Sequence, residues 1–573
     1  MKRCPECRRD YYDDSLLYCL DDGSALLEGP ASADEPATAV FPSVHTTEEE
    51  RTRTFDNEPA AQRSGGSSSF QHQASKRNAL IAGAIGIVVV TALAIGSYIY
   101  YGGTETQIRS IAVLPFVNES GNTEIEYLSD GMTETLINNL SQIPNLSVKA
   151  RSSVFRYKGK DIDPQKIATD LKVQAILNGR VMQRGDNLTL NLEMVDVQTG
   201  DQIWGQQYSR KLTDLVTLQS DIARDVSTKL RARLSGADER KVVKNYTANT
   251  EAYQLYLQGR YFWNKRNEAD IRKSLDYFQR AIEKDPTYAL AYAGLADAYS
   301  VLPSYTNDTA LDAYARARAA ALKALELDDS LAEPHATLGT ILMENDWNFT
   351  ESEREFKRAI ELNPSYATAH HWYAEYLLAM GRDDEALAEI KRAQELDPLS
   401  LIINGIVGVV HHQRGEHEQA VVQLKKTIEI DPSFARSHMF LAEIYREQGM
   451  YELAIDEGEK HMTLLGLPPN DAARMAAALR SAFRKSGEKG YLRMQLELIE
   501  AVRAIDPNLA PPLFVMAAIH AKSGENDKAF EYLERAYTQR QPDMVRLKRD
   551  RNFESLRSDP RFADLLRRIG FPQ

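Results

Sequence analysis

A short pattern that recurs at nearly constant spacing constrains the fold of this chain more than any other feature. It has a small residue, usually Ala, then a Glu two positions later, and then Asp or Asn, usually before Pro. Five copies end at residues 286, 329, 364, 398 and 432, at steps of 43, 35, 34 and 34. The longer first step reflects an insertion near residues 303–312. A fixed period of this length indicates stacked units that bury a core only together.

Thirty-four residues is the period of the tetratricopeptide repeat, in which each unit is a pair of helices. Small residues such as Gly259 and Gly339 recur where the first helix of a unit must approach the second closely. The proline of the pattern ends the second helix and starts the next unit. We therefore expect an all-α tetratricopeptide-repeat superhelix of about eight units over residues 250–545, followed by a C-terminal cap over residues 546–573.

Such an array forms a right-handed superhelix, and its concave face, built by the first helices, is the usual peptide-binding surface. The residues predicted to line that groove are Tyr256, Arg260, His335, His371, Glu375, His412 and His438. The alternative for each is an ordinary solvated position. A metal site at the histidines near His371 and His412 is not favoured, because they lack a carboxylate or cysteine at ligand spacing.

Ala79–Tyr101 is a run of 23 residues without a charge. As a helix it reaches roughly 35 Å, enough to cross a hydrocarbon core of about 30 Å. The run starts too far into the chain and is too long for a cleaved signal peptide. A buried core helix is the other alternative. We predict one transmembrane helix, with possible homodimerisation through the small-residue pairs Ala82/Gly86 and Ala92/Gly96, although such pairs also occur by chance.

The charges beside this span predict its orientation. Arg63, Lys76 and Arg77 precede it, whereas only Arg109 lies in the twenty residues after it. The positive-inside rule then places the N-terminus in the cytoplasm and residues 102–573 outside. All three cysteines lie in the first nineteen residues, on the predicted reducing side, which agrees with that orientation.

The N-terminal cysteines have the spacing of a small zinc ribbon. Cys4 and Cys7 form one CxxC knuckle, and Cys19 with Asp22 supplies a second pair, giving three sulfur ligands and one oxygen. Residues 1–28 resemble the zinc-ribbon heads of bacterial membrane proteins and imply a structural Zn²⁺. The alternatives are free reduced thiols or a redox pair. Residues 29–78, rich in Pro, Ala, Ser, Thr and Glu, predict a disordered linker.

Residues 107–236 predict an α+β domain on a small mixed sheet. Apolar and β-branched runs separated by Gly, Asp and Asn turns indicate strands, and i, i+4 spacing indicates helices. The expected strands are Ile108–Phe116, Leu146–Tyr157, Ala175–Gln183, Leu188–Val197 and Gln202–Arg210. The expected helices are Leu128–Leu140, Pro164–Leu171 and Leu215–Leu234.

This region resembles the TolB-amino-terminal-like domain, which is related to the FlgO family of envelope proteins. The resemblance lies in SIAVLPFVNESG at Ser110–Gly121, YLSDGMTETLINNLSQIP at Tyr127–Pro144, KARSSVFRYKGKDID at Lys149–Asp163 and GDQIWGQQYSRKLTDLVTLQSDIA at Gly200–Ala223. It implies envelope-side interaction or sensing, between a membrane helix and the repeats. Relatives include CadC-like membrane regulators, some adenylate cyclases and receptor-type Ser/Thr kinases. Their cytoplasmic winged helix, cyclase or kinase is replaced here by the ribbon.

Several functions are disfavoured. The net charge is −13 and no long Lys/Arg block occurs, so we expect no nucleic-acid partner. The phosphate-binding GxxxxGK[ST], HExxH, GxSxG and kinase HRD…DFG patterns are missing from the sequence, so we predict that the chain is not an enzyme.

Two functions remain. The first is a membrane-anchored scaffold of the bacterial inner membrane, whose TolB-like domain and repeats bind envelope proteins or peptides on the periplasmic or extracellular side. The alternative is a one-component signal transducer that relays repeat occupancy through the membrane to the zinc ribbon. The sequence does not identify the repeat ligand.

Overall fold

The computed structural model describes residues 2–3, 10–11, 27–28, 108–160, 162–230, 236–304, 310–505 and 512–571. The chain forms two compact units, Met1–Gly103 and Thr104–Gln573. In the first unit, the described residues form three short antiparallel strands, β1 (Lys2–Arg3), β2 (Asp10–Tyr11) and β3 (Leu27–Glu28), in the order β2-β1-β3.

Several predictions fall outside the described residues: the zinc ligands Cys4, Cys7, Cys19 and Asp22, the linker 29–78, and the span Ala79–Tyr101 with Ala82/Gly86 and Ala92/Gly96. Within the described ranges, no helix has the length and apolar character needed to cross a membrane. The same ranges hold no group of three or more His, Cys, Asp or Glu side chains arranged to bind a metal ion.

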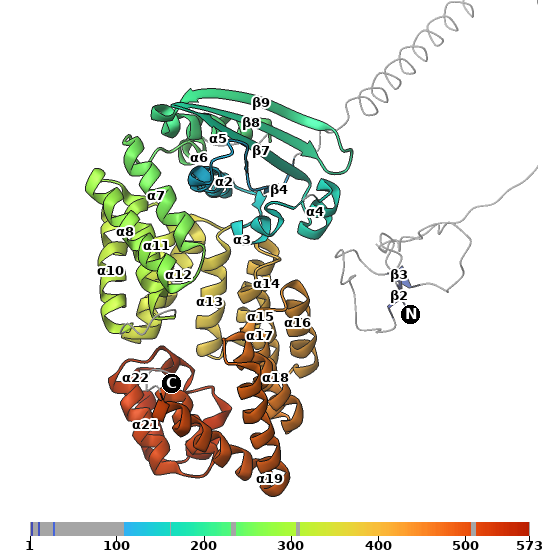
Figure 1. The fold of residues 1–573 in the computed structure, drawn as a ribbon, viewed down its shortest axis with the longest axis vertical. Coiled ribbons are helices and arrows are strands. Elements are labelled where there is room, and N and C mark those ends of the chain that lie inside the picture. Colours follow the sequence, from blue (N-terminus) through green and yellow to red (C-terminus); the bar gives the residue numbers. More distant parts are fainter. Residues whose placement is uncertain are drawn as a thin grey trace, which may run out of the picture. The chain divides into compact units, whose positions relative to one another are not determined.

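The second unit begins with the α/β domain (Figure 1). Its strands are β4 (Ser110–Val113), β5 (Val117–Asn118), β6 (Ser147–Val148), β7 (Ala175–Arg184), β8 (Asn187–Asp196) and β9 (Gln202–Lys211). The sheet order is β6-β4-β7-β8-β9, with β5 also paired to β7. β4 runs parallel to β6 and β7, whereas β7, β8 and β9 are antiparallel, so the predicted mixed sheet is confirmed.

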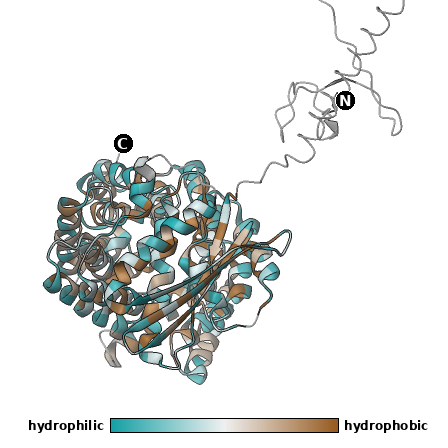
Figure 2. Ribbon diagram, turned by 90° about the horizontal axis from the view of Figure 1, so that it is seen from above, coloured by the Kyte–Doolittle hydropathy of each residue, from teal (hydrophilic) through white to brown (hydrophobic). Residues whose placement is uncertain are grey.

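Four helices accompany this sheet: α2 (Glu126–Ser141), α4 (Pro164–Leu171), α5 (Leu215–Lys229) and α6 (Gly236–Val242). Leu128, Met132, Leu136 and Leu140 on one face of α2 are fully buried, as the i, i+4 spacing predicts. Figure 1 shows α2 and α5 between the sheet and the first repeats. Seen from above, the sheet lies across the helical body (Figure 2).

The predicted strand Leu146–Tyr157 is wrong. Only β6 is extended; the chain then forms the helical turn α3 (Arg151–Val154) and the 3₁₀ turn η2 (Phe155–Tyr157). The reason is a tertiary contact, because this segment docks on the repeats. Its Lys149 Nζ donates a hydrogen bond to the carbonyl oxygen of Glu395 at 2.6 Å, and the Ala150 amide donates one to Leu396 O at 3.1 Å.

Eight pairs of helices follow in the described part of the chain, as predicted. The pairs are α7 (Thr250–Trp263) and α8 (Glu268–Lys284), α9 (Ala289–Val301) and α10 (Ala310–Leu327), α11 (Ala332–Ile341) and α12 (Phe349–Leu362), α13 (Ala367–Ala379) and α14 (Asp383–Leu396), α15 (Leu401–Gln413) and α16 (His417–Ile430), α17 (Ala435–Glu447) and α18 (Tyr451–Leu464), the two halves of α19 (Pro469–Ile505), and α20 (Leu513–Lys522) and α21 (Asn526–Thr538). A kink at Ser486 and Gly487 divides α19.

Two further features shape the array. A π-helical turn, η5 (Leu342–Asp346), extends α11. Beyond α21 lies η7 (Pro542–Arg546), and the predicted cap over residues 546–573 contains η8 (Arg551–Leu556) and α22 (Pro560–Ile569).

The small residues of the repeats have the predicted packing role. A Cβ atom added to Gly339 would lie 2.8 Å from the ring of Phe356, and one added to Gly259 would lie 2.5 Å from Phe278. Both distances are shorter than carbon atoms tolerate in a packed interior. Hydrogen at these positions therefore allows the first helix to lie directly against the aromatic side chain of the second.

The α/β domain is attached along the turns that end successive repeats. The Asp or Asn of the repeat pattern has a polar contact in each of the five copies. Its partner, through a hydrogen bond or an ion pair, lies either in the α/β domain or in the segment that joins the domain to α7. The pairs are Asp285 with Thr247, Asp328 with Lys244, Asn363 with Ser141, Asp397 with Ser152 and Ser153, and Asp431 with Arg156. The Asp and Asn residues of the repeat pattern therefore also hold the α/β domain and its connecting segment against the repeats.

Candidate functional site

A cavity of about 530 Å³ lies on the face built by the first helices α13, α15 and α17. We call it the groove cavity. These three helices form one wall, and Pro512, Val515 and residues 542–551 of the C-terminal segment form the other. Its apolar lining includes Leu378, Ile406, Val409, Met439, Phe440 and Val515. The lining also includes six carboxyl and four guanidinium groups, so the cavity offers a ligand both an apolar surface and charged contacts.

The C-terminal segment closes this cavity through contacts with distant helices. Arg549 forms an ion pair with Asp383 at 2.6 Å, and Arg551 forms one with Glu447 at 3.5 Å. The final residues also reach the third repeat, since the rings of Phe349 and Phe571 stack at 5.1 Å. The predicted cap therefore does more than cover the end of the array: it folds back over the concave face.

Two carboxyl groups in the groove cavity have no ion pair with a lysine or arginine in the described part of the chain. Glu344 lies on η5 and accepts a 2.6 Å hydrogen bond from the Tyr314 hydroxyl. Glu375 lies on α13, and its Oε2 atom is 3.5 Å from Nε2 of His371. Most other lining acids are paired: Arg546 lies within 4 Å of Glu443, Asp543 and Asp550.

Burial sets the protonation of these groups. It raises the pKa of Glu344 to about 7, with additional repulsion from Glu375 and Asp543. It also raises the pKa of Glu375 to about 7, against the opposing charges of Arg436 and Arg546. Burial with Arg436 nearby lowers the pKa of His371 to about 4, so this histidine is neutral at pH 7 and supplies no cation to Glu375.

Of the predicted groove residues, Glu375 and His412 line the groove cavity, and His371 lies behind Glu375. His412 Nε2 is 3.2 Å from Glu447 Oε2, and its Nδ1 is 3.0 Å from Nδ1 of His417. A role of these residues in binding a partner stays a prediction.

His335 and His438 are engaged within their own repeats. Their Nδ1 atoms lie 2.5 Å from carboxylate oxygens of Glu355 and Glu457, which are on the second helix of the same unit. The equivalent positions in the two intervening repeats hold His370–Glu389 at 2.6 Å and Asn404–Gln423 at 2.9 Å. These hydrogen-bonded pairs between the two helices of a repeat were not predicted from the sequence. A polar residue on the first helix followed by a polar partner 19 or 20 residues later is a pattern that could have predicted them.

Tyr256 and Arg260 lie at the junction with the α/β domain instead of the groove cavity. Tyr256 is buried, and its ring meets that of Tyr288 edge-on at 5.3 Å. Arg260 pairs with Glu134 of α2 at 2.6 Å and with Asp297 of α9 at 3.2 Å. These contacts leave little of either side chain for a partner.

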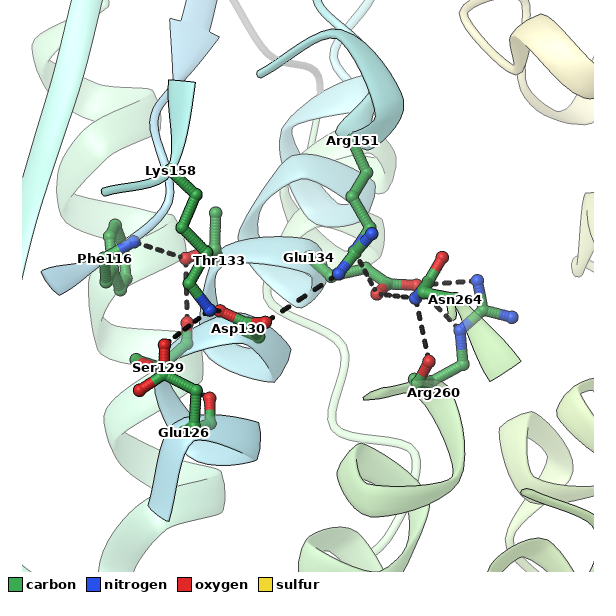
Figure 3. A network of polar contacts seen from close by, with 10 residues as sticks. All are labelled: Phe116, Glu126, Ser129, Asp130, Thr133, Glu134, Arg151, Lys158, Arg260 and Asn264. Atoms are coloured by element: carbon green, nitrogen blue, oxygen red, sulfur yellow. Dashed lines mark hydrogen bonds and ion pairs between the residues drawn. The ribbon is translucent and has the colours of Figure 1, made fainter. Parts of the chain in front are cut away.

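Figure 3 shows the network around Glu134. Burial acts to raise the pKa of Glu134, but Arg260 and Arg151 beside it outweigh that effect and lower it. The amide of Asn264 donates a further hydrogen bond to Glu134 at 2.8 Å. A fully paired buried carboxylate of this kind orients α2 against α7 and joins the two domains.

Comparisons with known proteins agree with this division. Residues 106–224 match the second domain of HilA/YgeH-like transcriptional regulators, and residues 347–400 match the tetratricopeptide repeat. The chain therefore contains a HilA/YgeH-like regulator domain followed by tetratricopeptide repeats. The more specific resemblance to a TolB-amino-terminal-like domain stays a prediction.

One curated relative is a protein of Rhizobium meliloti (strain 1021) named "Putative adenylate cyclase 3". It is 33% identical over 234 residues, which are 41% of this chain and 40% of the relative. The chain thus spans about two fifths of the length of this relative.

The comparison with solved structures finds similarity to YrrB and MamA, among others. YrrB, described as a tetratricopeptide-repeat protein with an unusual peptide-binding site, is 24% identical and covers 32% of this chain and 89% of its own, with a TM-score of 0.23. MamA is 21% identical and covers 29% of this chain and 93% of its own, with a TM-score of 0.24.

Proposed function

We propose that this chain is a protein–protein interaction scaffold, and that its groove cavity binds a peptide segment of a partner protein. The observation that carries the proposal is the cavity of about 530 Å³ on the face built by α13, α15 and α17. Its apolar wall suits side chains of an extended or helical segment, and its polar groups suit orientation of that segment.

We further propose that the chain is anchored in a bacterial membrane with its N-terminus in the cytoplasm. The uncharged run Ala79–Tyr101 supports a membrane anchor, and Cys4, Cys7, Cys19 and Asp22 support a structural Zn²⁺ in a cytoplasmic ribbon. The repeats then face the periplasm or the outside of a bacterial cell. Reporter fusions at both termini test this arrangement, and a cytoplasmic C-terminus would exclude envelope partners.

Charge substitutions in the cavity test partner binding. Met439 and Val515 line the groove cavity and are 38% and 37% exposed, so Met439→Lys and Val515→Lys introduce charge without opening the core. Both variants should lose partners captured by cross-linking of the full chain. Met450→Lys is the matched control, because Met450 is 46% exposed and lies outside the cavity lining. Equal capture by all three variants would place binding elsewhere.

A second candidate function is signal transduction. It is favoured by the match of residues 106–224 to a regulator domain and by the attachment of that domain to three successive repeat turns, at Asn363, Asp397 and Asp431. A change in superhelix curvature on peptide binding would reach the domain through those turns. Deletion of residues 1–28 separates the two candidates: a transducer should lose its output and keep its partners, whereas a scaffold should keep both.

A further inference from the structure

The groove cavity contains an imbalance of charge that indicates what kind of peptide it accepts. Its lining contains six carboxyl groups and four guanidinium groups: Glu344, Glu375, Glu443, Glu447, Asp543 and Asp550 against Arg436, Arg546, Arg549 and Arg551. Arg546 compensates Glu443, Asp543 and Asp550, and Arg551 and His412 contact Glu447. Glu344 and Glu375 are the two lining carboxyl groups without a close ion pair to a lysine or arginine among the described residues, although Arg436 and Arg546 act on Glu375 at longer range.

These two carboxyl groups act on each other. They come from different elements, η5 and α13, yet the charge of Glu375 contributes to the raised pKa of Glu344. Both side chains line the same cavity, and two like charges in one cavity favour either protonation or a bound cation. The Tyr314 hydroxyl occupies one acceptor position of Glu344 and leaves others free, because a carboxylate offers about four.

We propose that the groove cavity recognises a peptide segment carrying a lysine or arginine, whose cationic end binds between Glu344 and Glu375. This inference rests on the proposed peptide-binding function. The apolar stem of such a side chain, or its hydrophobic neighbours, would pack on Ile406, Val409 and Phe440 on the same cavity wall. Burying the stem while the charged end reaches an acceptor is the usual behaviour of long basic side chains.

An acidic peptide is the competing ligand, and Arg436 is the residue that would attract it. Arg436 lies on the cavity lining and is exposed, with no hydrogen bond or ion pair among the described residues. An exposed guanidinium is well solvated and gains little from one more surface ion pair. Glu344 is only partly exposed, so it gains more from a counter-charge than Arg436 does, whereas the Glu375 side chain is 39% exposed and gains less.

Selection from a random decapeptide display library on the immobilised full chain tests the proposal. The wild type should enrich peptides with one lysine or arginine beside apolar residues, and E344Q/E375Q should lose that basic preference. The matched control is E361Q/E395Q, which changes the same net charge at side chains that are 67% and 66% exposed and outside the cavity. Circular dichroism checks that every variant is folded.

An enriched peptide resynthesised with citrulline or norleucine at the basic position should bind wild type at least about tenfold more weakly, the loss of one charge-assisted contact. This measurement decides the question even if E344Q/E375Q does not fold. Enrichment of acidic or purely apolar peptides, or a basic preference that survives E344Q/E375Q, would overturn the inference and leave the peptide-binding function standing. Failure of every form to enrich any peptide would overturn both.

Discussion

The hydroxyl of Ser153 donates a 2.5 Å hydrogen bond to the carboxylate of Asp397, although 244 residues separate them in the chain. Asp397 ends a repeat, whereas Ser153 belongs to the α/β domain. The Leu399 amide donates to the same hydroxyl at 2.9 Å, so Ser153 is held from both sides. This contact belongs to the series of five that joins the domain and its connecting segment to the repeat turns.

Asp397→Ala should destabilise the second unit by about 2–3 kcal/mol, because it leaves the buried hydroxyl group of Ser153 without its acceptor and removes the bond from the exposed Ser152. Urea unfolding measures the loss, and hydrogen exchange should show faster opening of residues 149–157. Asp384→Ala is the control: its side chain is 92% exposed, and a change within about 0.5 kcal/mol is expected. Equal losses would argue against a docking role for Asp397.

Gly339→Ala should cost about 1–3 kcal/mol, because the new methyl group would meet the ring of Phe356 at 2.8 Å and force the helices apart. Gly458→Ala, in another repeat helix, should instead increase stability. No heavy atom lies within 4 Å of its added Cβ, so the better helix propensity of alanine should stabilise by up to about 1 kcal/mol. Thermal unfolding of both variants measures the two changes in stability. A change of the same sign in both variants would refute the packing argument.

Arg260→Met should destabilise the junction by about 3–5 kcal/mol, because it leaves the buried carboxylates of Glu134 and Asp297 without a shared cation. Adding Glu134→Gln to that variant should recover part of the loss. A double-mutant cycle on urea unfolding measures the coupling, and additive losses would show that the pair does not interact energetically.

The ligand-free protein should lose stability as the pH rises from about 4.5 to above 7. Folding raises the pKa of Glu344 and Glu375 to about 7, so their contribution is fully present below their unfolded pKa and lost as the pH passes the folded value. His371 acts in the opposite sense, since its lowered pKa of about 4 costs stability as the pH falls from about 6.5. Comparing wild type with E344Q/E375Q isolates the glutamates, and parallel pH profiles would contradict their assignment.

Zinc binding by the N-terminal ribbon gives a direct test of the proposed metal site. Metal analysis of the purified full chain should find one Zn²⁺ per chain, and Cys4→Ser with Cys7→Ser should abolish it. Chelation should leave the thermal unfolding of the second unit unchanged, because that unit contains no cysteine. Retained zinc in the double variant would exclude the predicted ligands.

Local and periodic features were predictable from the sequence, whereas long-range contacts were not. The 34-residue period located the repeats, and Pro164–Leu171 coincides with α4, since Asp163 caps that helix and Pro164 starts it. The segment Leu146–Tyr157 was assigned wrongly because its conformation depends on Asp397 and Leu396, about 245 residues away. The groove cavity was only partly anticipated, because residues 542–551, which close it, follow the helices of the opposite wall by about a hundred residues or more.

The packing of the C-terminal segment against the third repeat changes how this array should unfold. Repeat arrays usually open from their ends, because a terminal unit has only one neighbour. Here Tyr537 packs on Trp347 with 5.0 Å between ring centres, and Phe571 stacks on Phe349, so the last unit has a second neighbour from the middle of the chain. Fraying of the C-terminal segment should therefore be coupled to opening of the third repeat.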